Sequence, residues 1–168
     1  MLTYHPALDP FHAAFRAVRL LSYRPDVALH RDELRLFDFY LLFPSTLADM
    51  MLPRDLASHR SAFRARTNRY WFSGEPLLVF NKIAAIQQQG LALLRGAAYV
   101  EAAENAQDYF RITLTALRSP LLPSAQQANA RDENVVAFLL TGLHSLSPFG
   151  PKGLKARSGL MEYRYDPA

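Results

Sequence analysis

The side chains that could do chemistry in this chain are scattered, and their spacing fits no catalytic or metal-binding motif. The five histidines occur singly, so a metal site would need an assembly that the sequence does not indicate. Ser145 and Ser147 lie beside His144, but no nucleophile elbow or oxyanion-hole pattern surrounds them. Because the chain has no cysteine, thiolate zinc sites, iron–sulfur clusters and cysteine nucleophiles are excluded. We therefore predict no catalytic residue, no metal and no cofactor.

Positive charge is concentrated in one segment of the chain. The formal net charge is +4, and sixteen arginines outnumber three lysines. Between residues 54 and 69, five arginines face a single acid, Asp55. Such a cluster could bind phosphates or an acidic protein face, and an arginine-rich chain could equally carry it on a solvated surface. The contact candidates of this cluster are Arg54, Arg60, Arg64, Arg66 and Arg69.

A second basic segment follows residue 149. Gly150-Pro151-Lys152-Gly153 lacks the spacing and the terminal Gly-Lys-Ser/Thr of a phosphate-binding P-loop, so a basic glycine turn is the better interpretation. From such a turn Lys152, Lys155 and Arg157 could contact a phosphate or an acidic partner.

The N-terminal half predicts two helices that must be packed together. Asp9 before Pro10 predicts a helix that begins at Pro10 and ends before Arg24. A second helix opened by Asp32-Glu33 continues through Leu34–Phe43, which is apolar on all sides and must be covered by other elements or by another chain. We interpret Asp38 in its middle as a carboxylate held by a core arginine or by backbone donors. The core or interface candidates are Phe37, Asp38, Phe39, Tyr40, Phe43 and Trp71.

The C-terminal half predicts a helix followed by a hairpin. Helical spacing of Leu78, Phe80 and Ile83 indicates a buried stripe on a helix over 76–95, which Gly90 weakens. Alternating apolar and polar residues predict two strands, over 97–101 and 109–115, which a polar turn over 102–108 joins. A longer helix over 124–146 and a short strand over 161–165 complete the predicted order.

These elements predict an α+β fold that is mainly α. We expect a helical N-terminal region over residues 1–75 and a winged-helix-like helix–hairpin lobe over residues 76–168, packed as one compact unit. No apolar run long enough to span a membrane is expected, because Arg16, Arg19 and Asp38 interrupt the best candidates. No secretory signal is visible in Met1–Pro10, so we expect a cytoplasmic protein.

Two N-terminal stretches resemble a known family. They are Tyr4-His5-Pro6-Ala7-Leu8-Asp9-Pro10-Phe11-His12-Ala13-Ala14-Phe15-Arg16 and Leu34-Arg35-Leu36-Phe37-Asp38-Phe39-Tyr40-Leu41-Leu42-Phe43-Pro44, and the Arg157-Ser158-Gly159-Leu160 end is also similar. They resemble the middle components of bacterial three-component ABC-ATPase systems, the Lamassu-like group of conflict and phage-defence operons. The resemblance implies a small non-enzymatic subunit with a winged-helix-type lobe. It would lie between an SMC/Rad50-like ABC ATPase and an effector, often a nuclease, and reach DNA through that complex.

Two other classes of function remain open from the residues alone. An autonomous winged-helix DNA-binding regulator would use Lys82, Arg95 and Arg111 on phosphates, although the helix offers mainly Gln87-Gln88-Gln89 for base recognition. A small enzyme would need catalytic carboxylates that the sequence does not reveal.

Overall fold

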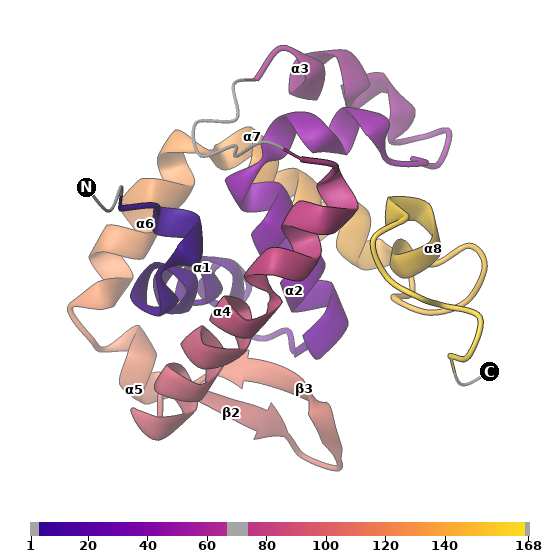
Figure 1. Ribbon diagram of the computed structural model, residues 1–168. Helices are drawn as coiled ribbons and strands as arrows, with labels where there is room; N and C mark the ends of the chain where they lie inside the picture. Colours follow the sequence, from indigo (N-terminus) through magenta and orange to yellow (C-terminus); the bar gives the residue numbers. More distant parts are fainter. Residues whose placement is uncertain (1–3, 67–73, 167–168) are drawn as a thin grey trace.

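A computed structural model describes residues 4–66 and 74–166 of the chain (Figure 1). The described residues are 62% helical and include one small antiparallel sheet, which confirms the predicted α+β, mainly α class. The elements of the N-terminal half are η1 (Pro6–Leu8), α1 (Pro10–Tyr23), β1 (Leu29–His30), α2 (Arg31–Leu42), η2 (Pro44–Asp49), η3 (Ala57–His59) and α3 (Arg60–Arg64). Those of the C-terminal half are α4 (Pro76–Gly96), β2 (Val100–Ala103), β3 (Ala106–Ile112), α5 (Leu114–Leu117), α6 (Leu121–Arg131), α7 (Glu133–Ala137), η4 (Phe138–Gly142), η5 (Leu143–Ser145) and α8 (Leu154–Ser158).

Local side-chain caps fix where α1 and α2 begin. Asp9 accepts hydrogen bonds from the backbone N–H of Phe11 (2.8 Å) and His12 (3.4 Å), so the predicted N-cap of α1 is confirmed. At α2, the side chain of His30 accepts from a backbone N–H of the first turn while the Glu33 carboxylate accepts from the His30 N–H. This reciprocal capping box starts α2 one residue before the predicted Asp32.

The sheet joins the two halves of the chain. Its strand order is β1-β3-β2, with every pair antiparallel, and Leu29 lies opposite Phe110. Ala103 pairs with Ala106, so the hairpin turn is much tighter than the predicted 102–108 turn. Asn105 takes a left-handed conformation (φ 59°) in this turn, which asparagine tolerates better than most residues.

Several predicted strand bounds are wrong for local reasons. β2 begins at Val100 instead of 97, because the backbone N–H groups of residues 97–99 bond back to the end of α4, and β3 begins at Ala106 instead of 109. The strand predicted over 109–115 ends at Ile112, because the Thr113 hydroxyl accepts from the Ala116 N–H and caps α5. Leu114 therefore lies in a helix and is 66% exposed instead of continuing the buried alternation. The predicted strand 161–165 is a turn instead. There the Glu162 carboxylate accepts from nearby backbone N–H groups, and such local bonds compete with a strand ladder.

The last predicted helix, 124–146, is divided in the structure. α6 begins at Leu121 and ends at Arg131, and α7, η4 and η5 follow it as short pieces. The break falls at Asp132, whose carboxylate takes part in ion pairs with Arg19 (2.7 Å) and Arg66 (3.2 Å). The predicted inward positions of these pieces are buried as expected, namely Val135, Phe138, Leu139 and Leu143.

The hydrophobic core draws on both halves of the chain. One cluster of buried side chains includes Phe37 from α2, Ile83 from α4 and Leu139 from η4. α1 crosses α4 at Gly90, where an added Cβ would lie 2.8 Å from the Ala14 backbone nitrogen. The glycine that weakens the helical pattern is therefore the residue that permits this close approach.

α4 is long and apolar enough to cross a membrane by length and composition alone. This finding differs from the prediction that no apolar run is long enough to span a membrane. One third of its most apolar stretch is buried inside the fold, on the side that carries Val79, Phe80 and Ile83. Core helices pass the same test, so the match is weak evidence for a membrane span.

Candidate functional site

A buried polar network fixes the helices that surround the candidate site. Asp38 is 4% exposed, and its carboxylate accepts from Arg16 Nε (2.6 Å) and Nη2 (3.2 Å). Gln87 Nε2 donates to the same carboxylate over 2.9 Å. The interpretation of Asp38 as a carboxylate held by a core arginine is confirmed. Because these residues come from α1, α2 and α4, the network sets how the three helices sit against one another.

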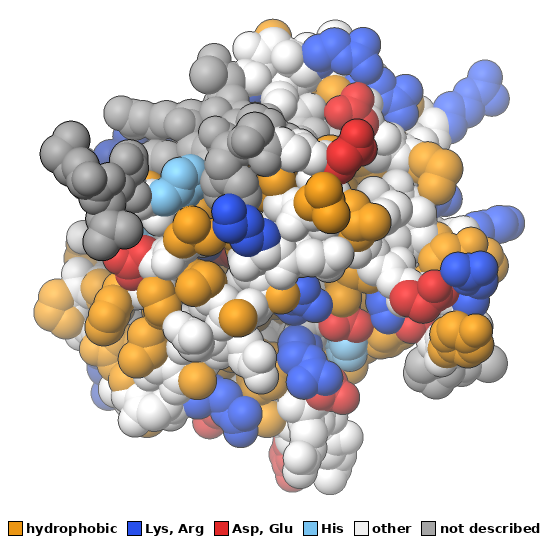
Figure 2. Space-filling model, in the orientation of Figure 1, with side chains coloured by type: hydrophobic (Ala, Val, Ile, Leu, Met, Phe, Trp, Pro, Cys, Tyr) orange, Lys and Arg blue, Asp and Glu red, His pale blue; other side chains and the backbone are white. Residues whose placement is uncertain are grey.

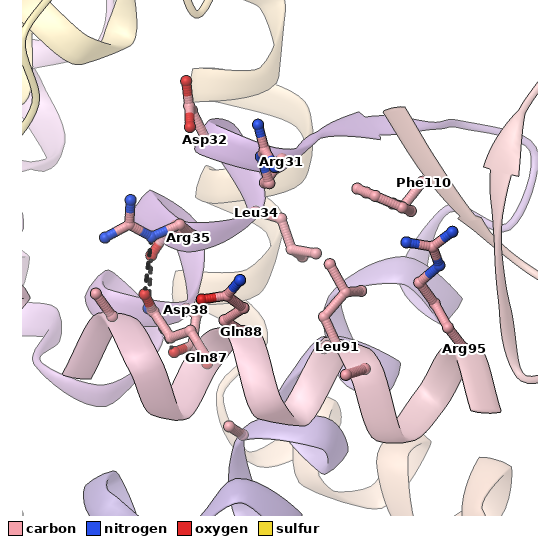
Figure 3. A pocket seen from close by; sticks show the side chains of 14 residues that line it. Arg31, Asp32, Leu34, Arg35, Asp38, Gln87, Gln88, Leu91, Arg95 and Phe110 are labelled. Carbon is pink, nitrogen blue, oxygen red and sulfur yellow. Dashed lines mark hydrogen bonds between the residues drawn. The ribbon is translucent and has the colours of Figure 1, made fainter. Parts of the chain in front are cut away.

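Arg35 extends the network toward the surface. Its Nε donates to Gln87 Oε1 (3.2 Å), and Gln87 Nε2 donates back to the Arg35 carbonyl (3.1 Å), as the dashed lines in Figure 3 show. The guanidinium lies over the Phe80 ring, 4.7 Å from its centroid. Burial lowers the pKa of Arg35 from its usual value, but the group stays cationic at neutral pH. Packing and bonding thus hold this guanidinium in one place.

Beside Arg35 a cavity of about 440 Å³ opens between α1, α2, α4 and β3. We call it the arginine pocket, since Arg31, Arg35 and Arg95 line it. Figure 3 shows Arg35 and Arg95 at opposite ends of the pocket, with Leu34 and Leu91 between them. The remaining lining residues are Ala13, Ala17, Asp32, Asp38, Ala84, Gln87, Gln88, Ala92 and Phe110.

The outward side of α4 carries large apolar side chains. Leu77, Leu78 and Leu93 are 45%, 63% and 41% exposed, respectively, and α4 runs across the front of the molecule in Figure 1. The placement of Leu78 in the buried stripe is wrong, because the apolar run 77–80 is wider than one helix face and only Val79 and Phe80 turn inward. We call this side the α4 face; its other exposed residues are Asn81, Lys82, Ala85, Gln88, Gln89, Ala92, Arg95 and Gly96.

The N-terminal segment adds apolar surface next to α4. η1 contacts α4, and the Pro10 carbonyl lies 3.0 Å from the Cβ position of Gly90. Leu8 and Phe11, which flank this contact in sequence, are 38% and 73% exposed. Figure 2 shows hydrophobic side chains gathered over α1, α6 and the adjoining part of α4. An apolar surface of this kind is typical of a protein–protein contact.

The fold places the arginines of the predicted cluster in different surroundings. Arg54 and Arg64 are exposed, near η3 and α3 at the top of Figure 1. Arg60 Nη2 donates to the Met50 carbonyl (3.1 Å), and Arg66 pairs with an aspartate of the α6–α7 junction. Arg69 lies outside the described residues. Two of the four described arginines are therefore bound within the fold.

The basic C-terminal candidates divide in the same way. Lys152 is exposed, but Lys155 is 8% exposed, with its Nζ 2.6 Å from Asp166 and 3.4 Å from Asp32. Arg157 donates to the carbonyls of Lys152 (2.6 Å) and Met51 (2.8 Å). Lys155 and Arg157 thus hold the C-terminal segment against the rest of the chain.

The aromatic candidates of α2 belong to the core. Phe37, Phe39, Tyr40 and Phe43 are at most 2% exposed, so elements of this chain cover the helix that is apolar on all sides. Phe39 packs edge-on against neighbouring aromatic rings on α2 and α4. Trp71 lies outside the described residues.

One close acid–histidine pair joins the buried Glu33 of α2 to the partly buried His144 of η5. Glu33 Oε1 lies 2.6 Å from His144 Nδ1, and Oε2 accepts from the His30 backbone. Burial raises the pKa of Glu33, and the contact with His144 opposes this shift. Both carboxylate oxygens take part in structural bonds. Within residues 4–66 and 74–166, no group of three or more His, Asp or Glu side chains is placed to hold a metal ion.

Comparison of the chain with known proteins identifies its family. The model of ABC-three component (ABC-3C) system Middle Component 5 matches residues 2–166. The chain belongs to this family. Searches of curated proteins and of solved structures returned no match. The match confirms the resemblance to a middle component of a three-component ABC system, and the name implies other components with which this one works.

Sequence reasoning missed most of the site of this middle component. Arg31 and Arg35 stand four residues apart at the start of α2, so they share one helix face, and this spacing was the available signal. For the α4 face, the signal was the run 77–80, whose width cannot be buried on one side. The convergence of Arg95 on the same pocket has no local signature, because it depends on how α4 crosses α2.

Proposed function

We propose that this middle component is a non-enzymatic adaptor that docks through its α4 face onto an SMC/Rad50-like ABC ATPase. It connects that ATPase to an effector, a nuclease, in prokaryotic defence against phages or plasmids. The complex works in the cytoplasm, and DNA is reached through the assembled complex. The observation that carries the proposal is the α4 face, with three exposed leucines on a helix of a chain whose family works in a multi-component system.

The order of elements supports a winged-helix-type lobe, built from elements between Pro10 and Ile112 and so placed differently from the lobe predicted over residues 76–168. α1, β1, α2, α4 and the β2–β3 hairpin follow one another with sheet order β1-β3-β2, and η2, η3 and α3 lie between α2 and α4 in the chain. In such a lobe α4 occupies the place of a recognition helix. Here its exposed side is mostly neutral or apolar, which suits a protein surface better than a phosphate backbone.

The matched test compares variants of exposed apolar residues on different faces of the molecule. The charged double variant Leu78→Asp/Leu93→Asp alters the α4 face, and Met51→Asp, at a residue 61% exposed outside it, is the control. Burying one leucine side chain stabilises a complex by about 1.5–3 kcal/mol, and the introduced carboxylates add a desolvation cost. We expect the double variant to bind at least about tenfold more weakly.

The measurement is co-purification with the ATPase and effector encoded beside this gene, followed by a titration of the purified ATPase. Melting curves check that both variants fold. A wild-type chain that never co-elutes with the ATPase overturns the proposal. Equal weakening by the double variant and by Met51→Asp overturns the role of the α4 face.

An autonomous DNA-binding regulator is the second candidate, and two cationic side chains on α4 favour it. Lys82 and Arg95 are exposed on α4, whereas Arg111 is paired with Glu101 over 2.8 Å on the hairpin. Binding of the isolated chain to operator DNA that survives about 200 mM salt would favour this class, because contacts limited to phosphates weaken steeply there.

A further inference from the structure

We infer that the arginine pocket binds an acidic side chain on an apolar segment of the companion ATPase. This inference rests on the proposed function, and it assigns the chemistry of the partner at that surface. Gln88 and Ala92 belong both to the α4 face and to the lining of the pocket. A segment laid across the α4 face can therefore place one side chain into the pocket without leaving the helix.

The acids that line the pocket are paired with basic groups behind it. Asp38 is held by Arg16, its ion-pair partner on α1, whereas Asp32 shares Lys155 Nζ (3.4 Å) with Asp166 (2.6 Å) and so cancels at most one of the pocket's guanidinium charges. The pair of Arg31 with Asp108 (3.2 Å) is more than half exposed on both sides, so water screens it. The guanidinium groups of Arg35 and Arg95, at the two ends of the pocket, therefore give it a net positive charge.

The pocket is built to recognise a carboxylate rather than a base. Arg35 is held by Gln87 and Phe80, so its planar donor group is oriented before a ligand arrives. Leu34 and Leu91 provide an apolar surface for the methylene groups of a Glu or for a neighbouring aliphatic side chain.

Stacking of a nucleic-acid base is disfavoured by the aromatic residue that lines the pocket. Phe110 is 4% exposed, and the Arg95 guanidinium lies over its ring at 5.6 Å. Proteins that bind single-stranded nucleic acid present open aromatic faces for stacking. The charge of the pocket together with its aliphatic surface therefore favours an acidic–apolar peptide.

The test uses short overlapping peptides that tile the companion ATPase, labelled and titrated with the full chain by fluorescence anisotropy. We expect binding by peptides in which Asp or Glu adjoins an apolar residue. Replacing those acids by Asn or Gln should weaken binding at least about tenfold, as should Arg95→Gln. Arg118→Gln is the control, because Arg118 is exposed and does not line the pocket.

The outcomes separate this inference from the proposed function. If no acidic peptide binds while the intact ATPase still co-purifies in a manner that depends on Leu78 and Leu93, the pocket assignment is overturned and the adaptor role stands. If inorganic phosphate or oligo(dT) binds with the same dependence on Arg95 and the peptides do not, the ligand is a phosphate group and the inference is overturned; binding of oligo(dT) alone would identify a nucleic acid. If the wild-type chain never co-purifies with the ATPase, both fail.

Discussion

Replacing Asp38 by Asn tests whether the buried network holds the three central helices together. The substitution keeps the size of the side chain, but it leaves the Arg16 guanidinium buried without its counter-ion, at a site where both side chains are at most 7% exposed. The introduced amide also directs an N–H donor toward Gln87 Nε2 or the Arg16 guanidinium, which are themselves donors at this position.

Breaking a buried ion pair on one side costs about 3–5 kcal/mol, out of a total stability of about 5–15 kcal/mol for a domain. For a chain of this length each kcal/mol corresponds to a change in Tm of about 2–4 °C, so Asp38→Asn should lower Tm by roughly 6–20 °C.

The assay is urea unfolding followed by far-UV circular dichroism, with Arg16→Met/Asp38→Leu as the matched control. That double variant leaves no buried charge, so it should recover most of the lost stability. A loss below about 1 kcal/mol in Asp38→Asn, or a double variant no more stable than the single one, would refute the reasoning. A stable Asp38→Asn chain that assembles with its partners but inactivates the system would instead indicate a catalytic carboxylate.

Two further predictions concern single positions of the fold. Gly90→Ala should destabilise the chain by about 1–3 kcal/mol, because the new methyl group meets the α1 backbone, whereas Gly96→Ala on the same helix has open space and should be neutral or stabilising. Equal urea midpoints for the two variants would contradict this. Since burial raises the pKa of Glu33, the native state binds its proton more tightly than the unfolded state. The free energy of unfolding should then fall as pH rises from about 4.5 through the raised pKa, and Glu33→Gln should reduce this slope while exposed Glu104→Gln does not. A slope unchanged by Glu33→Gln in urea titrations across that range would contradict the assignment.

The predictable parts of the fold are those with a local cause. Asp9 before Pro10 determines the start of α1, and the apolar run after Asp32-Glu33 determines α2. Predicted boundaries were wrong where a side chain forms a hydrogen bond with nearby backbone, as Thr113 does when it caps α5. They were also wrong at Asp132, where distant arginines converge on one carboxylate and the predicted long helix is divided.

The candidate site was less predictable than the fold because exposure is a property of packing. Lys155 and Arg157 carry the same charge as Lys152. The groups packed around them in the fold determine that these two bind within the chain. Leu78 is as apolar as Phe80, and the position of α2, whose Phe39 and Arg35 pack against the Phe80 ring, decides which of the two faces solvent.

By itself, the sequence determined the helical character of this middle component, the N-terminal cap of its first helix, the burial of Asp38 and the lack of a recognisable catalytic motif. These features depend on residue types and on spacings within a few turns of one helix. Only the tertiary structure decided that α2 is enclosed by its own chain, that leucines of α4 face outward, and that Arg31, Arg35 and Arg95 share one pocket. The physical reason is that side chains distant in sequence meet only once helix crossing fixes their positions, and Gly90 sets where α1 crosses α4.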